Sequence, residues 1–353
     1  KYLCGAGVAF KLVQGLFERY YRESDSMYRM IPYLDLAALA TVADIVALKG
    51  DNRILVKFGL EEMKQGKRVG LKALWKVSRS NESAELNTVA VGFNIAPRLN
   101  ACGRIGDVRL GLRLLTTDDP EEAEQIAYKL DAENKSRQEI EREIFEEALV
   151  KVASSKPDLR KGLIVIGEDW HPGVIGIVAS RLVEQFYTPT IVLTKVNGLY
   201  KGSGRSIEGF HLQQALAQCA DYLESFGGHA QAAGLSVQPE NLALFQQKFA
   251  LAVQQATTSE TFIPTLYIDG EIGVNDLNND IYDDINKLQP TGTANALPIF
   301  VCRSQTTTEV RCVGATGDHL RIKLRTNQGE IVGIGFKKAE LESVIAEGSI
   351  DIA

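Results

Sequence analysis

Residues 163–193 decide the fold, beginning with the apolar run Leu163-Ile164-Val165-Ile166 and ending with Thr190-Ile191-Val192-Leu193. Both runs are short and rich in β-branched residues, as in buried strands, and the stretch from Gly173 to Phe186 between them has helical spacing. Further helices are predicted at 212–226 and 242–256. Strands that alternate with helices indicate an α/β domain, which we place at residues 157–258.

A long helix is predicted immediately before this domain. Asp119 is a suitable N-cap, Pro120 fits the first helical position, and neither Gly nor Pro then occurs before Pro157. The middle of the segment, residues 131–139, is almost wholly polar, and a helix that is polar on all sides usually bridges domains through solvent. We therefore interpret residues 118–156 as a connector helix.

The segments on either side differ in kind. Residues 1–117 have mainly helical periodicity, with helices expected at 8–17, 52–63 and 69–77 and a further apolar stretch at 34–48. Residues 259–353 alternate apolar and polar positions, with strands expected at 266–272, 299–308, 320–326 and 330–336. A small barrel or sandwich is predicted there, with an oligonucleotide/oligosaccharide-binding (OB) barrel a leading candidate. The predicted fold class is therefore a multidomain α/β protein that ends in a β-barrel.

Composition narrows the function classes. The 353 residues are 45% apolar and 24% charged, as in a globular protein, and contain no apolar run long enough for a membrane span. The net charge of −6 argues weakly against nucleic-acid binding, although a local basic patch would suffice. The five cysteines are scattered, which argues against a disulfide framework and structural zinc and favours a reducing cytoplasm. The first residues do not resemble a signal peptide and lack an initiator Met, so we expect a fragment trimmed at both ends.

Two glycine-containing motifs are candidate phosphate sites. In Gly227-Gly228-His229, the glycines allow close backbone approach, and His229 is expected at the start of a helix, where phosphate binds well. The alternative is a Gly-Gly turn whose His caps that helix. Gly202-Ser203-Gly204-Arg205-Ser206 offers hydroxyls and a guanidinium for phosphate, and its alternative is a polar turn after a strand.

Three weaker candidates lie elsewhere. The stretch Pro97 to Arg104 contains Arg98, Asn100 and Arg104, which suit phosphate contacts or ion pairs with carboxylates such as Asp107. Asp44 has apolar neighbours, so its carboxylate should be hydrogen-bonded at a helix end, paired or metal-bound. His171 precedes a helix and is read as a loop residue.

Segments spread over nearly the whole chain resemble motifs of the RecJ-type exonucleases of the DHH phosphoesterase family, in that family's order. These segments are 40–46, 97–104, 167–179, 202–206, 227–234 and 288–295. The resemblance departs from the family pattern at Cys102, where Ala is usual, and at Thr291 and Thr293-Ala294, where Phe and Pro-Gly are usual. It implies that residues 1–117 are the C-terminal part of a DHH domain, 157–258 a DHHA1 domain and 259–353 an OB-like barrel.

The resemblance also implies an activity. The family hydrolyses single-stranded DNA from the 5′ end to mononucleotides in recombination and repair, with two Mn²⁺ or Mg²⁺ ions. Asp44 would be one metal ligand and, with Arg205 and His229, a catalytic residue. The implied DNA- or phosphate-binding residues are Arg98, Asn100, Arg104, His171, Ser203, Gly204, Arg205, Ser206, Gly227, Gly228 and His229. Single-strand-binding protein and a helicase are the implied partners besides single-stranded DNA.

The family's other metal-binding motifs, D-x-D-x-D-G and Asp-His-His, do not occur in this sequence. We therefore expect this chain alone to be inactive. Two alternatives remain open. One is another DHH–DHHA1 enzyme that acts on short oligonucleotides or on 3′-phosphoadenosine 5′-phosphate. The other is a nuclease-derived protein that only binds DNA or assembles with replication factors.

Overall fold

The computed structural model describes residues 2–79, 81–327, 329–345 and 349–353. The chain divides into two compact units, which are described separately. The first comprises Lys1–Gln65, Glu85–Val91 and Leu266–Ala353, and the second comprises Gly66–Ala84 and Gly92–Thr265. No helix in the described part of the chain is both long and apolar enough to cross a membrane.

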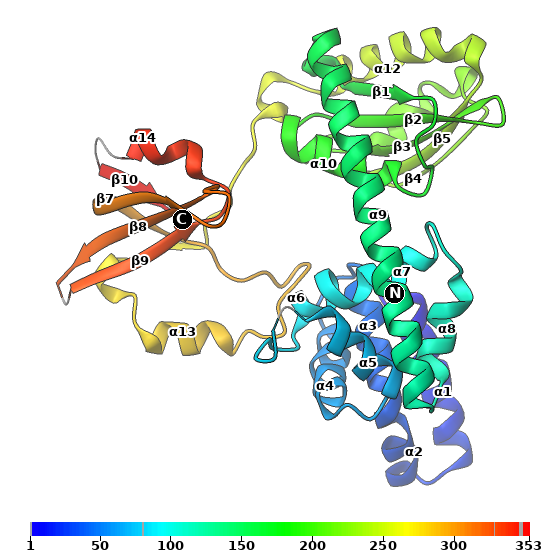
Figure 1. Cartoon of the computed structure of the whole chain (residues 1–353), viewed down its shortest axis with the longest axis vertical. Helices are drawn as coiled ribbons and strands as arrows, with labels where there is room; N and C mark the ends of the chain where they lie inside the picture. The colour runs from blue at the N-terminus through cyan, green and yellow to red at the C-terminus, as the bar shows by residue number, and fades with distance from the viewer. Residues whose placement is uncertain (1, 80, 328, 346–348) are drawn as a thin grey trace. The chain divides into compact units, whose positions relative to one another are not determined.

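The first unit combines helices with a C-terminal sheet (Figure 1). Its helices are α1 (Gly5–Tyr20), α2 (Glu23–Met30), α3 (Leu34–Ala43), α4 (Asp51–Gln65), α6 (Thr88–Ala90), α13 (Asn279–Asn286) and α14 (Glu342–Ile345). Its strands are β6 (Gly270–Glu271), β7 (Phe300–Val313), β8 (His319–Thr326), β9 (Gly329–Gly335) and β10 (Ser349–Ile352). The expected helices near 8–17 and 52–63 are confirmed as α1 and α4, and the apolar stretch 34–48 is helical as α3 up to Ala43.

The C-terminal sheet has the strand order β10-β7-β8-β9, with β6 paired to β7. Leu320, Ile322 and Leu324 alternate along β8 and form its core with Val274. Among the described strands β9 and β10 do not pair, so the sheet is open rather than a closed barrel. The predicted strands at 299–308, 320–326 and 330–336 are confirmed. The strand expected at 266–272 shrinks to β6, and the apolar residues Leu266, Tyr267 and Ile268 before it are exposed.

The second unit contains a helical part and an α/β part. Its helices are α5 (Val69–Ser78), α7 (Ala96–Cys102), α8 (Val108–Thr116), α9 (Pro120–Ser155), α10 (Ile175–Phe186), α11 (Leu212–Ala217) and α12 (Leu242–Ala256). Its strands are β1 (Leu163–Gly167), β2 (Thr190–Val196), β3 (Leu199–Arg205), β4 (Ser225–Gly228) and β5 (Ala232–Val237). They form one sheet in the order β1-β2-β3-β5-β4, in which only β1 and β2 are parallel.

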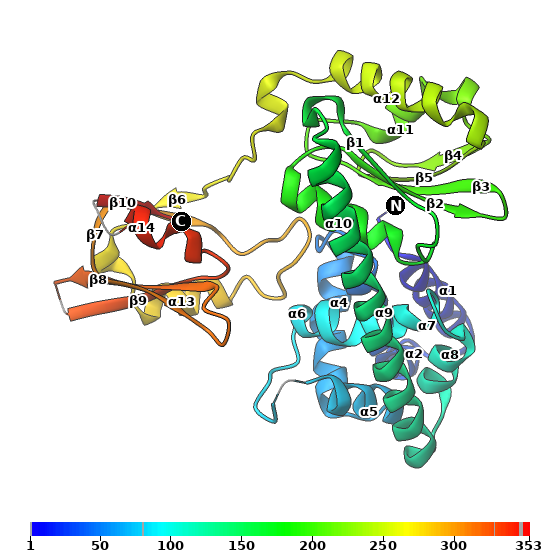
Figure 2. The same ribbon diagram turned by 45° about the horizontal axis from the view of Figure 1, so that its top comes forward.

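Helices cover both faces of this sheet (Figure 2). On one face Phe245 and Phe249 of α12 pack with Leu212 of α11 against the strands. On the other face α10 and the C-terminal half of α9 cover β1 and β2 through residues such as Val178 and Phe145. The predicted α/β layering is confirmed. Helix α10 also lies on β3, whereas β5 and β4 extend beyond this helix.

The long predicted helix is confirmed as α9. The Asp119 side chain accepts a hydrogen bond from the Glu121 amide (2.9 Å), and Lys156 ends the helix in the left-handed conformation. The expectation that its polar middle is solvated is wrong, because Asp131, Asn134 and Arg137 are all buried. Helix α7 packs on this stretch, and its Arg98 forms an ion pair with Asp131.

The helix predicted at 212–226 is also wrong beyond Ala217. Strand β4 follows, and Phe226 pairs with Leu235 of β5 in an antiparallel ladder. The Phe226 side chain packs on the core formed with α12. Contacts from distant segments thus override the local helical pattern.

Candidate phosphate and nucleic-acid site

The uncovered part of the sheet in the second unit forms a groove with a volume of about 560 Å³. Ser203 of β3 pairs with Gly234 of β5, which pairs with Gly227 of β4. Two of the three positions in this row lack side chains, so the floor is largely backbone. Polar side chains around the floor are Lys201, Ser203, Ser225 and Ser236.

Helix α10 begins beside Ser203 and Arg205. A Cβ atom on Gly176 would lie 2.9 Å from Ser203 Oγ and 3.1 Å from Arg205 Nη2, so glycine is what allows this close approach. Arg205 Nη1 donates to Ser203 Oγ at 3.1 Å and to the Gly204 carbonyl at 2.8 Å. The N-cap residue Val174 supplies no side-chain cap, and the positive end of a helix attracts anions. Hydroxyl, guanidinium and helix end together form a geometry suited to phosphate.

Arg104 adds positive charge to this site. Its Nη1 donates to the Gly173 carbonyl at 3.0 Å, one residue before the N-cap of α10. Desolvation, and after it the positive charge of Arg104, lowers the pKa of Arg205. Desolvation and the charge of Arg137 likewise lower the pKa of Arg104. An anionic ligand would relieve this repulsion between guanidinium groups.

The Gly227-Gly228-His229 motif forms a hairpin, so the expected helix after His229 is wrong. His229 lies in the turn between β4 and β5, and its amide donates to the Ala232 carbonyl at 2.8 Å. Gly228 has φ 147°, and a Cβ there would lie 2.4 Å from the Ala232 oxygen. Because Arg205 pairs with Ala232, the exposed His229 turn lies at the Arg205 end of β3.

Residues 202–205 of the second motif form part of β3 rather than a loop. Gly204 is buried and faces Leu212 on the opposite side of the sheet from the groove. The buried Ser206 hydroxyl donates to the Phe210 carbonyl at 2.8 Å, and therefore shapes the turn after β3. Of this motif, the structure brings Ser203 and Arg205 to the candidate site.

Arg98 and Asn100 lie on α7. The Arg98 guanidinium is bound to Asp131 of α9 and to the Asn94 carbonyl, so an ion pair engages it as the alternative interpretation anticipated. The partner is Asp131 rather than Asp107, which binds Arg109. Asn100 is exposed.

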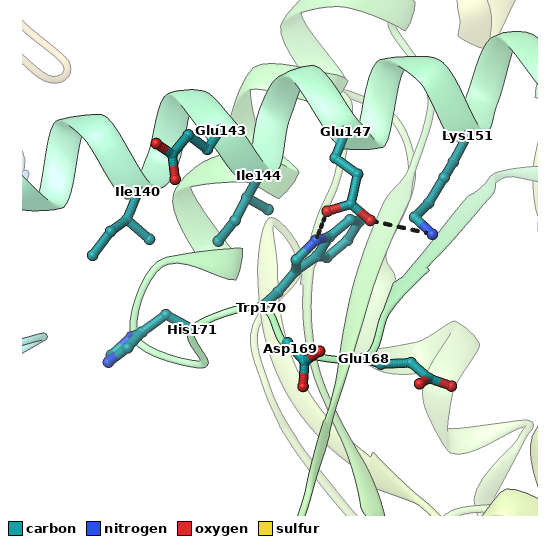
Figure 3. Close-up of a pocket in the computed structure, with 9 residues that line it drawn as sticks. All are labelled: Ile140, Glu143, Ile144, Glu147, Lys151, Glu168, Asp169, Trp170 and His171. Atoms are coloured by element: carbon teal, nitrogen blue, oxygen red, sulfur yellow. Dashed lines mark hydrogen bonds and ion pairs between the residues drawn. The ribbon is translucent and has the colours of Figure 1, made fainter.

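His171 lies in the loop before α10 and lines a second pocket of about 690 Å³ (Figure 3). Its Nδ1 accepts a hydrogen bond from the Gly173 amide at 3.1 Å. The other lining residues include Glu143, Glu147, Glu168 and Asp169, and Trp170 Nε1 donates to Glu147 at 2.8 Å. Four carboxylates around one lysine make this pocket unsuited to phosphate. His171 holds the turn that leads into α10.

Asp44 is the C-cap residue of α3 in the first unit, with an exposed side chain. Ile45 follows with φ 54°, a left-handed conformation that costs on the order of 1–3 kcal/mol for such a residue. The residues described here contain no group of three or more His, Cys, Asp or Glu side chains able to hold a metal ion. Asp44 fits the role of a single ligand, but the described chain does not form a metal site.

The sequence analysis missed a candidate surface on the C-terminal sheet. Because Leu320, Ile322 and Leu324 face the core, the residues between them lie on the other face. That face carries His319, Arg321, Lys323 and Arg325. The ring centroids of His319 and the exposed Phe336 lie 5.5 Å apart, with the rings packed edge-on. Aromatic and cationic side chains together suit single-stranded nucleic acid. In the sequence, the cationic residues at alternate positions 321, 323 and 325 could have indicated this surface.

Comparisons with known proteins agree with this architecture. Residues 159–255 match the DHHA1 domain, and residues 268–353 match the RecJ OB domain. The chain is therefore a DHHA1 protein with an appended OB domain.

The similarity extends beyond these domains. The chain is 38% identical over 351 residues to the single-stranded-DNA-specific exonuclease RecJ of Bacillus subtilis, covering 99% of this chain and 43% of that protein. It is 38% identical over 315 residues to that of Escherichia coli, covering 85% and 54%. The crystal structure of RecJ from Thermus thermophilus with Mg²⁺ matches with a TM-score of 0.80 and 30% identity, covering 94% of this chain and 50% of that one. RecJ of that organism was also solved with Mn²⁺.

The chain belongs to the RecJ family. It spans about half the length of the curated relatives it matches.

Proposed function

We propose that this chain is part of a metal-dependent exonuclease that degrades single-stranded DNA from the 5′ end to mononucleotides, in DNA recombination and repair. The observation that carries the proposal is the convergence of Ser203, Arg205 and Arg104 on the uncapped start of α10. This site lies beside a groove with a backbone floor, which suits a flexible strand. The relatives named as single-stranded-DNA-specific exonucleases support the same activity.

In this proposal the chain's residues bind and orient the strand. Arg205 and Ser203 hold the phosphate next to the cleaved bond, and Arg104 adds charge. His229 contacts the same phosphate from the β4–β5 turn, while Gly227 and Gly228 let the backbone approach. Asn100 adds a polar contact from α7. Arg98, Gly204 and Ser206 support the site indirectly, because their polar groups or positions are committed within the fold.

The proposed cofactor is a pair of Mn²⁺ or Mg²⁺ ions, which would supply an activated water and neutralise charge on the phosphate. Asp44 is the one proposed ligand from this chain. Because the described residues form no metal site by themselves, we expect the isolated chain not to cleave DNA.

Proposed partners are single-stranded DNA, single-strand-binding protein and a helicase, in the cytoplasm. The cytoplasmic location rests on the odd, scattered set of five cysteines, which suits a reducing compartment.

The test uses the complete protein that contains this chain. End-labelled single- and double-stranded DNA would be incubated with Mn²⁺ or Mg²⁺, beside Asp44→Ala, His229→Ala, Arg205→Met and Arg205→Lys. Arg160→Met, which removes an exposed arginine of the same unit, is the control. We expect metal-dependent loss of single strands from the 5′ end, strongly reduced by all four substitutions and unchanged by the control. The Arg205→Lys protein should also digest single strands poorly, because lysine cannot donate two parallel hydrogen bonds to phosphate.

The second candidate is a DNA-binding or replication-assembly protein without nuclease activity, and the cationic and aromatic side chains on the outer face of β8 and β9 would suit it. Salt-sensitive binding to single strands without digestion by the complete protein would support it. The other DHH–DHHA1 enzymes are disfavoured by the match of residues 268–353 to an OB domain.

A further inference from the structure

The loop 288–295 of the first unit holds a fixed conformation of its own. Asn295 Nδ2 donates to the carbonyls of Leu288 at 3.1 Å and Pro290 at 2.9 Å. The backbones of Gly292 and Asn295 exchange two further hydrogen bonds, of 2.9 and 3.0 Å. The loop is therefore closed by bonds within itself before any contact to other elements is considered.

Side chains of two helices of the same unit bind the loop through its carbonyl groups. Arg53 of α4 donates from Nη2 to the carbonyls of Leu288 at 2.8 Å and Gln289 at 3.3 Å. The buried Thr88 hydroxyl of α6 donates to the Thr291 carbonyl at 2.7 Å. All these acceptors are backbone atoms, so the contacts do not depend on which side chains the loop carries. The side chains of Thr291, Thr293 and Ala294, which depart from the family motif, take no part in these contacts.

The loop also holds the turn that follows α3. The Leu48 amide donates to the Thr293 carbonyl at 2.8 Å, and the Leu48 side chain is buried. This turn starts at Asp44, and Ile45 in its left-handed conformation comes next. Such a backbone conformation persists only where the surroundings determine it. The α3 end of the turn is held by its own helix, and the Leu48 end is held by the loop.

We propose that Arg53 and Thr88 are positioning residues: they lock the 288–295 loop, which in turn fixes both the Asp44 turn and the strands that follow the loop. Both residues belong to the first unit, whereas the candidate phosphate site is formed by residues of the second unit. The consequence for DNA rests on the proposed function. The 288–295 loop holds the Asp44 turn and also leads into the C-terminal sheet. A DNA strand bound on the outer face of β8 and β9 would therefore be held in a fixed relation to Asp44.

The experiment measures hydrogen–deuterium exchange and DNA binding of the complete protein. Thr88→Val removes the hydroxyl while keeping the shape of the side chain, and Thr88→Ser restores the hydroxyl. Arg53→Met removes the guanidinium, and Arg142→Met is its control, because Arg142 is an exposed arginine that pairs only with Glu146 among the described residues. Strands of about 20 nucleotides and about five nucleotides would be compared, since one OB domain occupies roughly 4–16 nucleotides.

We expect Thr88→Val and Arg53→Met to speed exchange in residues 41–49 about two- to tenfold, the effect of losing one net hydrogen bond. They should also weaken binding of the long strand more than of the short one. Thr88→Ser and Arg142→Met should behave as the unmodified protein.

The proposal would be overturned if the substitutions sped exchange in residues 288–298 but left the exchange rate of residues 41–49 unchanged. It would also be overturned if exchange changed in neither segment. A complete protein that binds no DNA would refute the proposed function, while the exchange result would still decide whether the loop holds the turn.

Discussion

The guanidinium of Arg98 binds one carboxylate oxygen of Asp131 through two nitrogens, Nε at 2.9 Å and Nη2 at 2.8 Å. The second carboxylate oxygen binds Lys135 at 2.8 Å. Both partners of the first contact are largely shielded from water. This contact fastens α7 to the polar middle of α9 and gives that stretch a structural role.

Arg98→Met should lower the free energy of unfolding by about 2–3 kcal/mol, because it leaves a buried carboxylate with only Lys135 as a partner. Arg142→Met, which breaks an exposed pair with Glu146, should cost less than about 1 kcal/mol. Urea denaturation measures both. A stable Arg98→Met protein whose DNA binding becomes less salt-sensitive would instead restore Arg98 as a phosphate contact.

The Asp131 carboxyl should make stability depend on pH in the acid range. Burial alone would raise its pKa, but hydrogen bonds from Lys135 and Arg98 hold the pKa below its ordinary value. Its stabilising effect is therefore complete above pH about 4 and is lost as the pH falls through the lowered pKa. Asp131→Asn should be less stable at pH 7 and lose less stability between about pH 4 and 2. Parallel stability curves for the two proteins would contradict this assignment.

Gly176→Ala should weaken binding of single-stranded DNA about tenfold, because the new methyl group displaces Ser203 and Arg205. Its unfolding temperature should change little, since alanine favours helices. Gly15→Ala in α1 is the matched control, because a Cβ at Gly15 meets nothing within 4 Å. Fluorescence anisotropy with labelled strands compares the two. Equal affinities would remove the start of α10 from the binding site.

Cys219 should resist thiol reagents while the protein is folded. Burial raises the pKa of its thiol to about 11, so about one thiol in a thousand is ionised at pH 8. Its side chain is also inaccessible and donates to the Ala215 carbonyl at 3.3 Å. The labelling rate of Cys219 by maleimide, with and without denaturant, can be measured by mass spectrometry. Rapid labelling of Cys219 without denaturant would show that α11 opens readily.

The sequence predicted the features that depend on neighbouring residues. The N-terminus of α9 follows from Asp119 and Pro120, and the strands near 163–166 and 190–193 follow from short β-branched runs. The motif at Ser203 and Arg205 was recognised by its donors, although it lies on a strand rather than in a loop. Its glycines suggested flexibility, but pairing with β2 and β5 extends the segment.

The features that the sequence did not predict depend on distant segments. The α9 middle looks polar because its partner for Asp131 is 33 positions earlier in the chain. Phe226 continues a helical pattern, yet pairing with Leu235 and packing on α12 place it in a strand. The contacts of Arg53 and Thr88 with the 288–295 loop span more than 200 positions, and spacing alone carries no signal for them.

The backbone floor of the groove affects whether the groove can distinguish one DNA sequence from another. Its lining residues include three glycines, three serines and a lysine, and no Asn, Gln, Asp or Glu. Those four side chains are the usual readers of adenine and cytosine edges, whereas contacts to phosphate set position without specifying sequence. Such a surface offers few side chains that distinguish adenine or cytosine from the other bases. The proposed exonuclease, which would remove every nucleotide of a strand in turn, would need a surface of this kind.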